Sequence, residues 1–97
     1  MLICTHDNGQ LNLDGDLQVA FLDSLMDCLE QVYSLDQALH IDLSRITAAD
    51  IAGLQVLLSF LRSRDEAAPA RLKEAPPAFL KALELSGLRE HFAHYLG

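Results

Sequence analysis

The sequence predicts an α/β fold, namely a small mixed four-stranded sheet with helices packed against it. Short apolar alternations typical of strands are separated by longer stretches with the 3.6-residue apolar spacing of helices, in the order β-β-α-β-α-β-α-α. An Asn-Gly pair at Asn8–Gly9 favours a tight hairpin between the first two strands. Because helices separate the later strands, we expect these strands to be parallel and their crossovers right-handed.

The length and charge of the chain limit what it can be. The 97 residues fit a single domain covering 1–97, and about half of them are apolar, which argues against disorder. The net charge of −7 argues against nucleic acid and anionic membrane surfaces as direct partners. No apolar run is long enough for membrane insertion, and Met1–His6 has no basic flank typical of a signal peptide. We therefore expect a cytoplasmic protein.

The first half of the chain begins with a hairpin and a long helix. The expected elements are a strand at Leu2–His6, a turn at Asp7–Gly9, a strand at Gln10–Leu13, a turn at Asp14–Asp16, a helix from Val19 to about Leu35 and a strand at Ala38–Leu43. Alternating apolar residues indicate the strands. The apolar face expected for the helix comprises Leu22, Leu25, Met26, Leu29, Val32 and Tyr33.

The segment from Leu39 to Leu61 is the centre of the predicted fold. A polar loop at Ser44–Ala49 follows the strand, and a helix runs from Asp50 to about Arg64. Asp50 is a suitable N-cap, because its carboxylate can accept hydrogen bonds from the first free amides of the helix. Glycine at position 53 costs helix propensity, so we expect close backbone approach there. The expected inner residues are Ile51, Leu54, Leu57, Leu58 and Leu61, opposite a polar stripe of Gln55, Ser59 and Arg62.

The last third of the chain predicts an edge strand and two short helices. Pro69 ends the preceding helix pattern, and the weakly patterned strand at Arg71–Ala75 suggests a sheet edge. A helix at Ala78–Leu85 is followed by Gly87, which is suited to the left-handed position after a helix. A final helix covers Arg89–Leu96. The residues expected to face inward are Phe79, Leu80, Leu83, Phe92, Tyr95 and Leu96.

No catalytic, metal or cofactor site is predicted. Cys4 and Cys28 have no ligand spacing, and we interpret both as reduced packing residues. His91 and His94 are three residues apart and could share a metal ion, but no cysteine joins them and both are expected on the solvent side. No nucleophile–base motif or phosphate loop is present, and acids in turns and caps do not require catalysis as an explanation. We expect no enzymatic activity.

Three segments in order resemble the STAS family, which includes bacterial anti-sigma-factor antagonists and cytoplasmic domains of sulfate transporters. LNLDGDL is similar to the family's opening strand and turn. HIDLSRITAADIAGLQVLL is similar to its signature region, in which Asp-x-x-Gly-Leu opens a helix. PPAFLKALELSGLREHF is similar to its closing segment, where a short helix ends in Ser-Gly-Leu. The resemblance covers nearly the whole chain and implies the STAS fold.

The resemblance also implies a protein-binding switch without chemistry of its own. In the best understood members, a Ser or Thr directly after the Asp is phosphorylated by a partner kinase, and the phosphate drives the two proteins apart. Here that position is Ile51, followed by Ala52, so the equivalent site cannot be phosphorylated. The nearest hydroxyls are those of Ser44 and Thr47. Our hypothesis is that the protein docks constitutively or is regulated through its partner's state.

The partner is expected to bind the loop and helix at 44–58. The candidate partner-binding residues are Ser44, Thr47, Asp50, Ile51, Ala52, Gly53 and Gln55. Ile51 fits two interpretations, as a docking residue or as the first residue of the core-facing stripe. The expected partner is an anti-sigma factor or serine kinase, or a chemotaxis-type complex.

Three further possibilities stay open. One is an accessory role beside an ABC transporter ATPase, because stand-alone STAS proteins of lipid-transport systems carry Asp-Thr-Ala-Gly-Leu where this chain has Asp-Ile-Ala-Gly-Leu at 50–54. Another is binding of a small anion or nucleotide at the amides of residues 50–53, although the nearby acids count against it. The third is a homodimer formed through apolar residues of the last helix.

Overall fold

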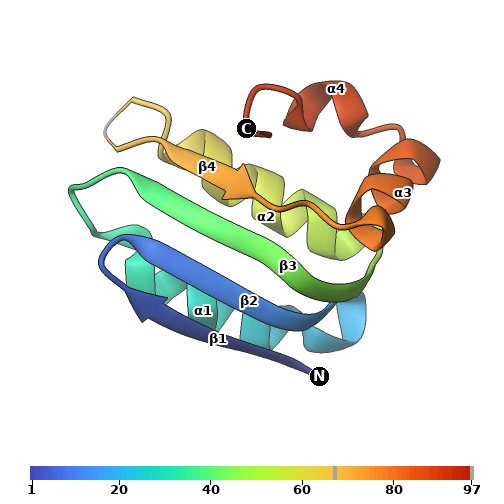
Figure 1. Ribbon diagram of the computed structural model, residues 1–97, viewed down its shortest axis with the longest axis horizontal. Coiled ribbons are helices and arrows are strands. Elements are labelled where there is room, and N and C mark those ends of the chain that lie inside the picture. Colours follow the sequence, from blue (N-terminus) through green and yellow to red (C-terminus); the bar gives the residue numbers. More distant parts are fainter. Residues whose placement is uncertain (67, 97) are drawn as a thin grey trace.

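The chain folds into one mixed sheet with helices on one side (Figure 1). A computed structural model describes residues 1–66 and 68–96. Strand β1 (Leu2–Asp7) pairs antiparallel with β2 (Gln10–Leu17), which pairs in parallel with β3 (Leu39–Ala49). Strand β4 (Ala70–Lys73) pairs in parallel with β3 and lies at the edge. The predicted fold class, the parallel later strands and the edge position of the last strand are confirmed.

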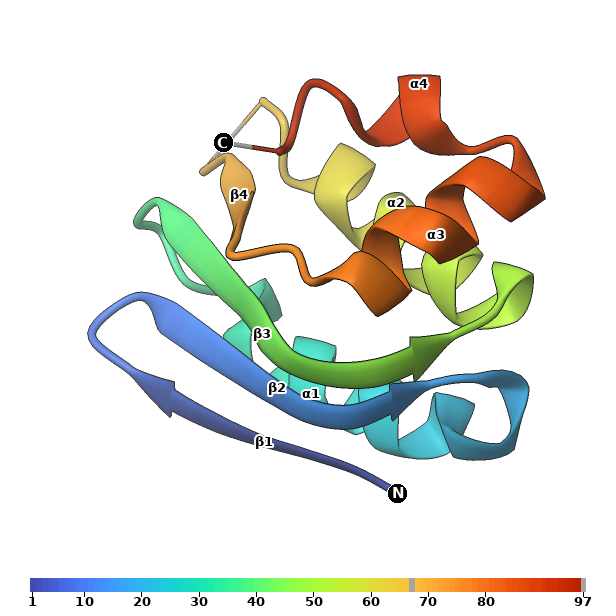
Figure 2. The same ribbon diagram turned by 45° about the vertical axis from the view of Figure 1, so that its right-hand side comes forward.

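The helices cover one face of the sheet and its β4 side. A single 3-10 turn, η1 (Val19–Phe21), precedes α1 (Leu22–Tyr33). Helix α2 (Ile51–Ser63) connects β3 to β4, and α3 (Pro77–Ser86) and α4 (Arg89–Phe92) follow. Figure 1 shows α1 and α2 behind the sheet and α4 beyond β4. Helix α3 lies past the C-terminal end of β4 and packs against β3 (Figures 1 and 2). Among the described residues, no helix covers the opposite face of β1–β3, which is largely polar.

Local signals placed the hairpin turn and the end of α3 correctly. Asn8 and Gly9 both have positive φ, at 48° and 79°, as a two-residue hairpin turn requires. Gly87 has a φ of 74° at the end of α3 and caps it in the left-handed conformation. These features depend on residues close in sequence, which is why the sequence pattern predicts them.

Strands β2 and β3 are longer than predicted. The expected turn at Asp14–Asp16 continues β2 to Leu17, and the expected loop at Ser44–Ala49 continues β3. The two segments pair with each other in parallel, with register shifts around residues 14 and 15–16. Gly15 lies inside the strand with a φ of 122°, so it permits an irregularity in the ladder, not a chain reversal. Both segments are polar, so the apolar pattern of the sequence did not indicate that they continue as paired strands.

On α1 and α3, three residues predicted to face inward are exposed. Met26 and Tyr33 on α1 are 56% and 57% exposed, and Leu80 on α3 is 42% exposed. The buried face of α1 is instead formed by Leu25, Cys28, Leu29 and Val32. The apolar arc of α1 is therefore wider than the strip that the sheet covers.

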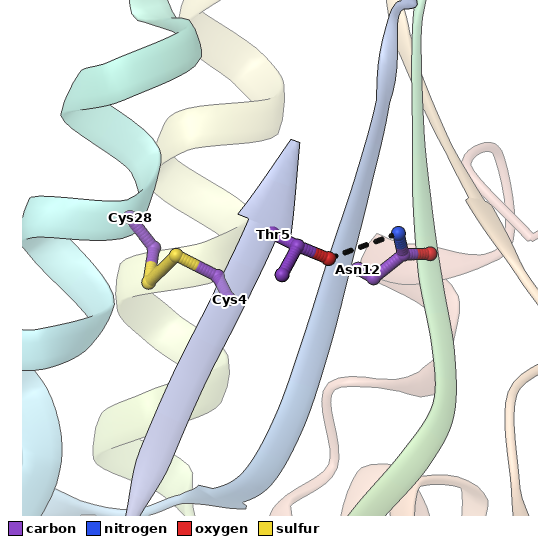
Figure 3. The surroundings of a disulfide bond; sticks show 4 residues. All are labelled: Cys4, Thr5, Asn12 and Cys28. Atoms are coloured by element: carbon purple, nitrogen blue, oxygen red, sulfur yellow. Dashed lines mark hydrogen bonds between the residues drawn. A yellow bond between two sulfur atoms is a disulfide. The ribbon is translucent and has the colours of Figure 1, made fainter. Parts of the chain in front are cut away.

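The two cysteines form a disulfide, so the prediction of two reduced packing residues is wrong. Figure 3 shows the bond between Cys4 on β1 and Cys28 on α1, with Cα atoms 6.1 Å apart. The side chain of Cys4 points toward the helix, while that of Thr5 points to the other face and accepts a hydrogen bond from Asn12 at 3.3 Å. Disulfides are uncommon in reducing compartments, and the cytoplasmic location stays a prediction.

The C-terminal segment leaves the helix earlier than predicted and joins the sheet. Helix α4 ends at Phe92, although the sequence pattern extended it to Leu96. The amide of Leu72 donates to the carbonyl of Tyr95 at 2.8 Å, and Leu72 and Leu96 form an isolated parallel bridge. This pairing protects the outer edge of β4, since an edge strand otherwise presents unpaired backbone groups.

Candidate functional site

Asp50 holds the start of α2 against the end of β2. One of its carboxylate oxygens accepts from the amide of Gly53 and the other from the amide of Val19, each at 2.9 Å. Its own amide donates to the carbonyl of Leu17, also at 2.9 Å. The predicted N-cap is confirmed, and the link to Val19 adds a contact between segments far apart in sequence. Because each oxygen accepts from a backbone amide, we infer that Asp50 serves to hold the start of α2 in position.

The close contact between the end of β2 and the start of α2 also requires a glycine at position 53. It is buried in the first turn of α2, and a Cβ placed on it would collide with the carbonyl oxygen of Leu17. The close backbone approach predicted from the glycine is confirmed. The amide of Gly53 is also engaged by Asp50, which counts against an anion or nucleotide at this helix start.

Ile51 faces solvent directly after the cap. Its side chain is 51% exposed, whereas Leu54, Leu57, Leu58 and Leu61 on the same helix are buried. Of the two interpretations of Ile51, the structure excludes the fully core-facing one. Val19 is 64% exposed, and its backbone is bound to Asp50 next to Ile51. Two large apolar side chains therefore lie beside the hydrogen-bonded junction of β2 and α2 and face solvent.

The two candidate hydroxyls lie outside the first turn of α2. Ser44 is exposed on β3, and its amide donates to Asp42 at 2.8 Å. The hydroxyl of Ser44, and after it this amide, lower the pKa of the Asp42 carboxyl. The hydroxyl of Thr47 donates to Asp16 at 2.9 Å. Hydrogen bonds from the Met1 ammonium and from Thr47 lower the pKa of the Asp16 carboxyl. Thr47 thus sits beside an ionised carboxylate.

Two further predicted site residues, Ala52 and Gln55, lie near the start of α2 and differ in exposure. Ala52 is half-buried, and Gln55 is exposed. Gln55 lines a hollow of about 370 Å³ together with Arg62 and His91, whose side chains contact each other at 2.9 Å between Nη2 and Nδ1. Residues 50, 51, 52, 53 and 55 are brought together at the start of α2, whereas Ser44 lines a separate hollow over the uncovered sheet face.

Val19 is a site residue that the sequence pattern did not identify. The pattern placed it at the start of the long helix, where it would be an ordinary first-turn residue. In the structure it belongs to the 3-10 turn η1, and its amide is the partner of Asp50. A local sequence pattern cannot predict this contact, because the two residues are 31 positions apart.

The part of the chain that the structure describes contains neither a metal-binding cluster nor a helix able to span a membrane. Across residues 1–66 and 68–96, no group of three or more His, Cys, Asp or Glu side chains could hold a metal ion together. His91 and His94 are both exposed, as predicted. In the same described residues, no helix is both long enough and apolar enough to cross a membrane.

One family model and solved structures of low sequence identity match this chain. A model of the STAS_2 family, described as "Mlab, STAS domain", matches residues 4–96. No curated protein sequence matches the chain. An anti-sigma factor antagonist from Mycobacterium paratuberculosis is similar in structure, with a TM-score of 0.76 and 20% identity over 99% of this chain and 83% of that one.

A second solved structure has the same fold. A sulfate transporter family protein from Wolinella succinogenes has a TM-score of 0.69 and 17% identity, over 90% of this chain and 73% of that one. At these identities the two structures establish the fold, while the family match covers almost the full chain. The protein therefore belongs to the STAS domain family.

Proposed function

We propose that this STAS domain is a non-enzymatic regulatory module that docks a protein partner constitutively through the start of α2. The docking surface consists of Ile51 with its exposed neighbours Val19 and Gln55. The observation that carries the proposal is the exposure of Ile51, at the position where the best understood family members carry a phosphorylatable Ser or Thr. An apolar residue held there by the Asp50 cap offers permanent contact area without a phosphate to interrupt it.

The first candidate partner is a regulatory kinase, an anti-sigma factor or a chemotaxis-type signalling complex. The structural similarity to an anti-sigma factor antagonist supports a role of this kind. The two nearest hydroxyls do not substitute for the missing switch, because Ser44 lies away from the docking surface and Thr47 is bound to Asp16. Regulation therefore acts on the partner, whose own state decides whether the constant surface of this protein is bound.

The second candidate partner is an ATPase subunit of a transporter. The sequence Asp50-Ile51-Ala52-Gly53-Leu54 resembles that of stand-alone STAS proteins in lipid-transport systems and differs from it at one residue. An accessory subunit requires a stable interface, and an unmodifiable apolar residue suits it. The same surface serves both candidates, so identification of the bound protein separates them.

The test compares binding by the wild-type protein and an Ile51→Asp variant. Partners are captured from the host and identified by mass spectrometry, and the affinity of the purified partner is then measured for each form. A carboxylate at the centre of the interface removes a contact of about 2 kcal/mol, so we expect binding at least about 30-fold weaker. Leu85→Asp is the matched control, because Leu85 is 80% exposed on α3.

The result expected is loss of one identified partner with Ile51→Asp and its retention with Leu85→Asp. A signalling kinase or an anti-sigma factor supports the first candidate, and a transporter ATPase supports the second. Equal capture by all three forms would reject Ile51 as a docking residue. Thermal unfolding checks that both variants remain folded, as we expect because each change replaces an exposed side chain.

A further inference from the structure

A shallow apolar groove runs between α1 and α2, separate from Ile51. Its volume is about 500 Å³, and its lining includes Met26 and Tyr33 from α1 and Val56 and Phe60 from α2. Met26 and Tyr33 are more than half exposed, while Phe60 is buried at 7% and forms part of the floor. The rings of Tyr33 and Phe60 are 6.3 Å apart between centroids, so the far end of the groove is aromatic. These two exposed residues are the ones that the helical pattern of α1 expected to be covered.

Glu30 lines the α1 side of this groove, and two further acids, Asp23 and Asp27, continue along the same side of the helix outside the groove lining. Asp23, Asp27 and Glu30 are all exposed, and their spacing of four and three residues places them along one side of the helix. Helix α1, from Leu22 to Tyr33, contains no Lys or Arg to neutralise them. The α2 side of the groove carries the uncharged Ser59 and Ser63. The groove therefore has an apolar floor, acids along its α1 side and an uncharged α2 side.

We propose that this groove binds an amphipathic helix of a partner protein, with apolar side chains at one face and Lys or Arg along one edge. A third helix can rest in the furrow between two packed helices at an axial distance of 8–10 Å, placing residues i, i+3 or i+4 and i+7 in the groove. Its basic edge lies against Asp23, Asp27 and Glu30. The volume of the groove suits several anchoring side chains.

Charge complementarity disfavours the two other obvious occupants. A second copy of this chain would place its own acidic α1 against the same acids, and the chain carries 14 acids against 7 bases. An anionic membrane surface is repelled for the same reason. A partner helix with Lys or Arg along one edge is attracted by the acids of α1, and this attraction sets the orientation of the helix in the groove.

The test uses two designed peptides of about 15 residues, because shorter helices are marginal in water. Both have the same leucine stripe; one has Lys along the flank, and the other has Glu at the same positions. Binding is followed by the methyl signals of methionine, of which the chain has two, Met1 and Met26. We expect the Lys peptide to bind and shift the Met26 signal, the Met1 signal to stay unchanged, and the Glu peptide to bind at least about tenfold more weakly.

Charge-reversal variants locate the effect. Asp27→Lys with Glu30→Lys should weaken the Lys peptide about tenfold and strengthen the Glu peptide. The matched control is Glu84→Lys with Glu90→Lys, which changes the net charge equally at exposed positions of α3 and α4 and should leave binding unchanged. Ile51→Asp should also leave peptide binding unchanged, so the groove and the Ile51 surface are tested independently.

Several outcomes would overturn the proposal. Equal binding of both peptides would show unselective apolar adhesion, and a shift of Met1 in place of Met26 would place the peptide elsewhere. Absence of binding by the Lys peptide would reject the groove as a helix site. A shift of Met26 that grows with protein concentration alone, without peptide, would show that a second copy covers the groove.

Discussion

At the scale of single residues, Gly53 shows how one missing side chain fixes the junction on which the candidate site rests. A Cβ at this position would collide with the backbone of Leu17, so Gly53→Ala must push α2 away from the end of β2. We expect a loss of about 1–3 kcal/mol in the free energy of unfolding from overpacking. The gain in helix propensity of about 1 kcal/mol offsets only part of it. Urea unfolding of the wild type and the variant measures the difference.

Ser59→Ala is the control for this substitution. Ser59 lies on the exposed side of α2, where alanine meets no backbone and improves helix propensity by a few tenths of a kcal/mol. This variant should be as stable as the wild type or slightly more stable. If Gly53→Ala were stabilised to the same extent, the close approach of α2 to Leu17 would not exist in solution.

At the scale of elements, Arg64 joins the ends of α1 and α2. It is only 4% exposed at the C-terminal end of α2. Its guanidinium donates to four carbonyls of the segment that ends α1, those of Val32 at 3.1 Å, Tyr33 at 2.9 Å, Leu35 at 3.1 Å and Gln37 at 3.0 Å. A cation at this position satisfies carbonyls that the end of a helix leaves free and complements the helix dipole. Both helices are thereby fixed relative to each other, and so is the groove between them.

Replacement of this arginine should therefore destabilise the whole fold. Arg64→Met keeps an apolar stem but leaves the carbonyls unpaired, and we expect a loss of roughly 3 kcal/mol in the free energy of unfolding. Arg64→Lys should cost less, because an ammonium can still bind some of the carbonyls. Urea unfolding measures both. Arg62→Met is the control, since the exposed Arg62 on α2 should contribute less than about 1 kcal/mol, and equal losses at both positions would contradict the bridging role.

The elements also show where sequence reasoning succeeds. The N-cap at Asp50, the close approach at Gly53 and the left-handed Gly87 follow from residues within one helical turn, and all three were predicted correctly. The extension of β3 through 44–49 could not be predicted, because its polar residues become a strand only by pairing with β2. The role of Arg64 was missed for the same reason, since its acceptors lie about 30 residues away.

The candidate site was likewise predictable in part. Its position at the start of α2 followed from the family resemblance and from the cap, but the structure was needed to show that Ile51 faces solvent. The spacing of apolar residues cannot decide this, because a first-turn residue points inward or outward according to what packs beside it. The exposed Met26 and Tyr33 illustrate the same limit, since a helical pattern defines an apolar arc and not the part of it that a neighbour covers.

At the scale of the whole molecule, both edges of the sheet are held by distant parts of the chain. Strand β4 is protected by the segment at Tyr95 and Leu96, and β1 is tied to α1 by the disulfide between Cys4 and Cys28. An edge strand has hydrogen-bonded neighbours on one side only, so such ties limit fraying and pairing with other chains. A domain of 97 residues has little stability to spare, which makes each tie significant.

Reduction of the disulfide should therefore lower global stability. The bond links residues 24 positions apart, and closing a loop of that length removes unfolded-state entropy equivalent to about 3 kcal/mol. Urea unfolding with and without a thiol reductant should show a lower midpoint for the reduced protein, with a native state that keeps its secondary structure. The double variant Cys4→Ser with Cys28→Ser should match the reduced protein and respond to no reductant. A wild-type midpoint that reductant leaves unchanged would mean that the two thiols only pack together, and β1 would then depend on its pairing with β2 alone.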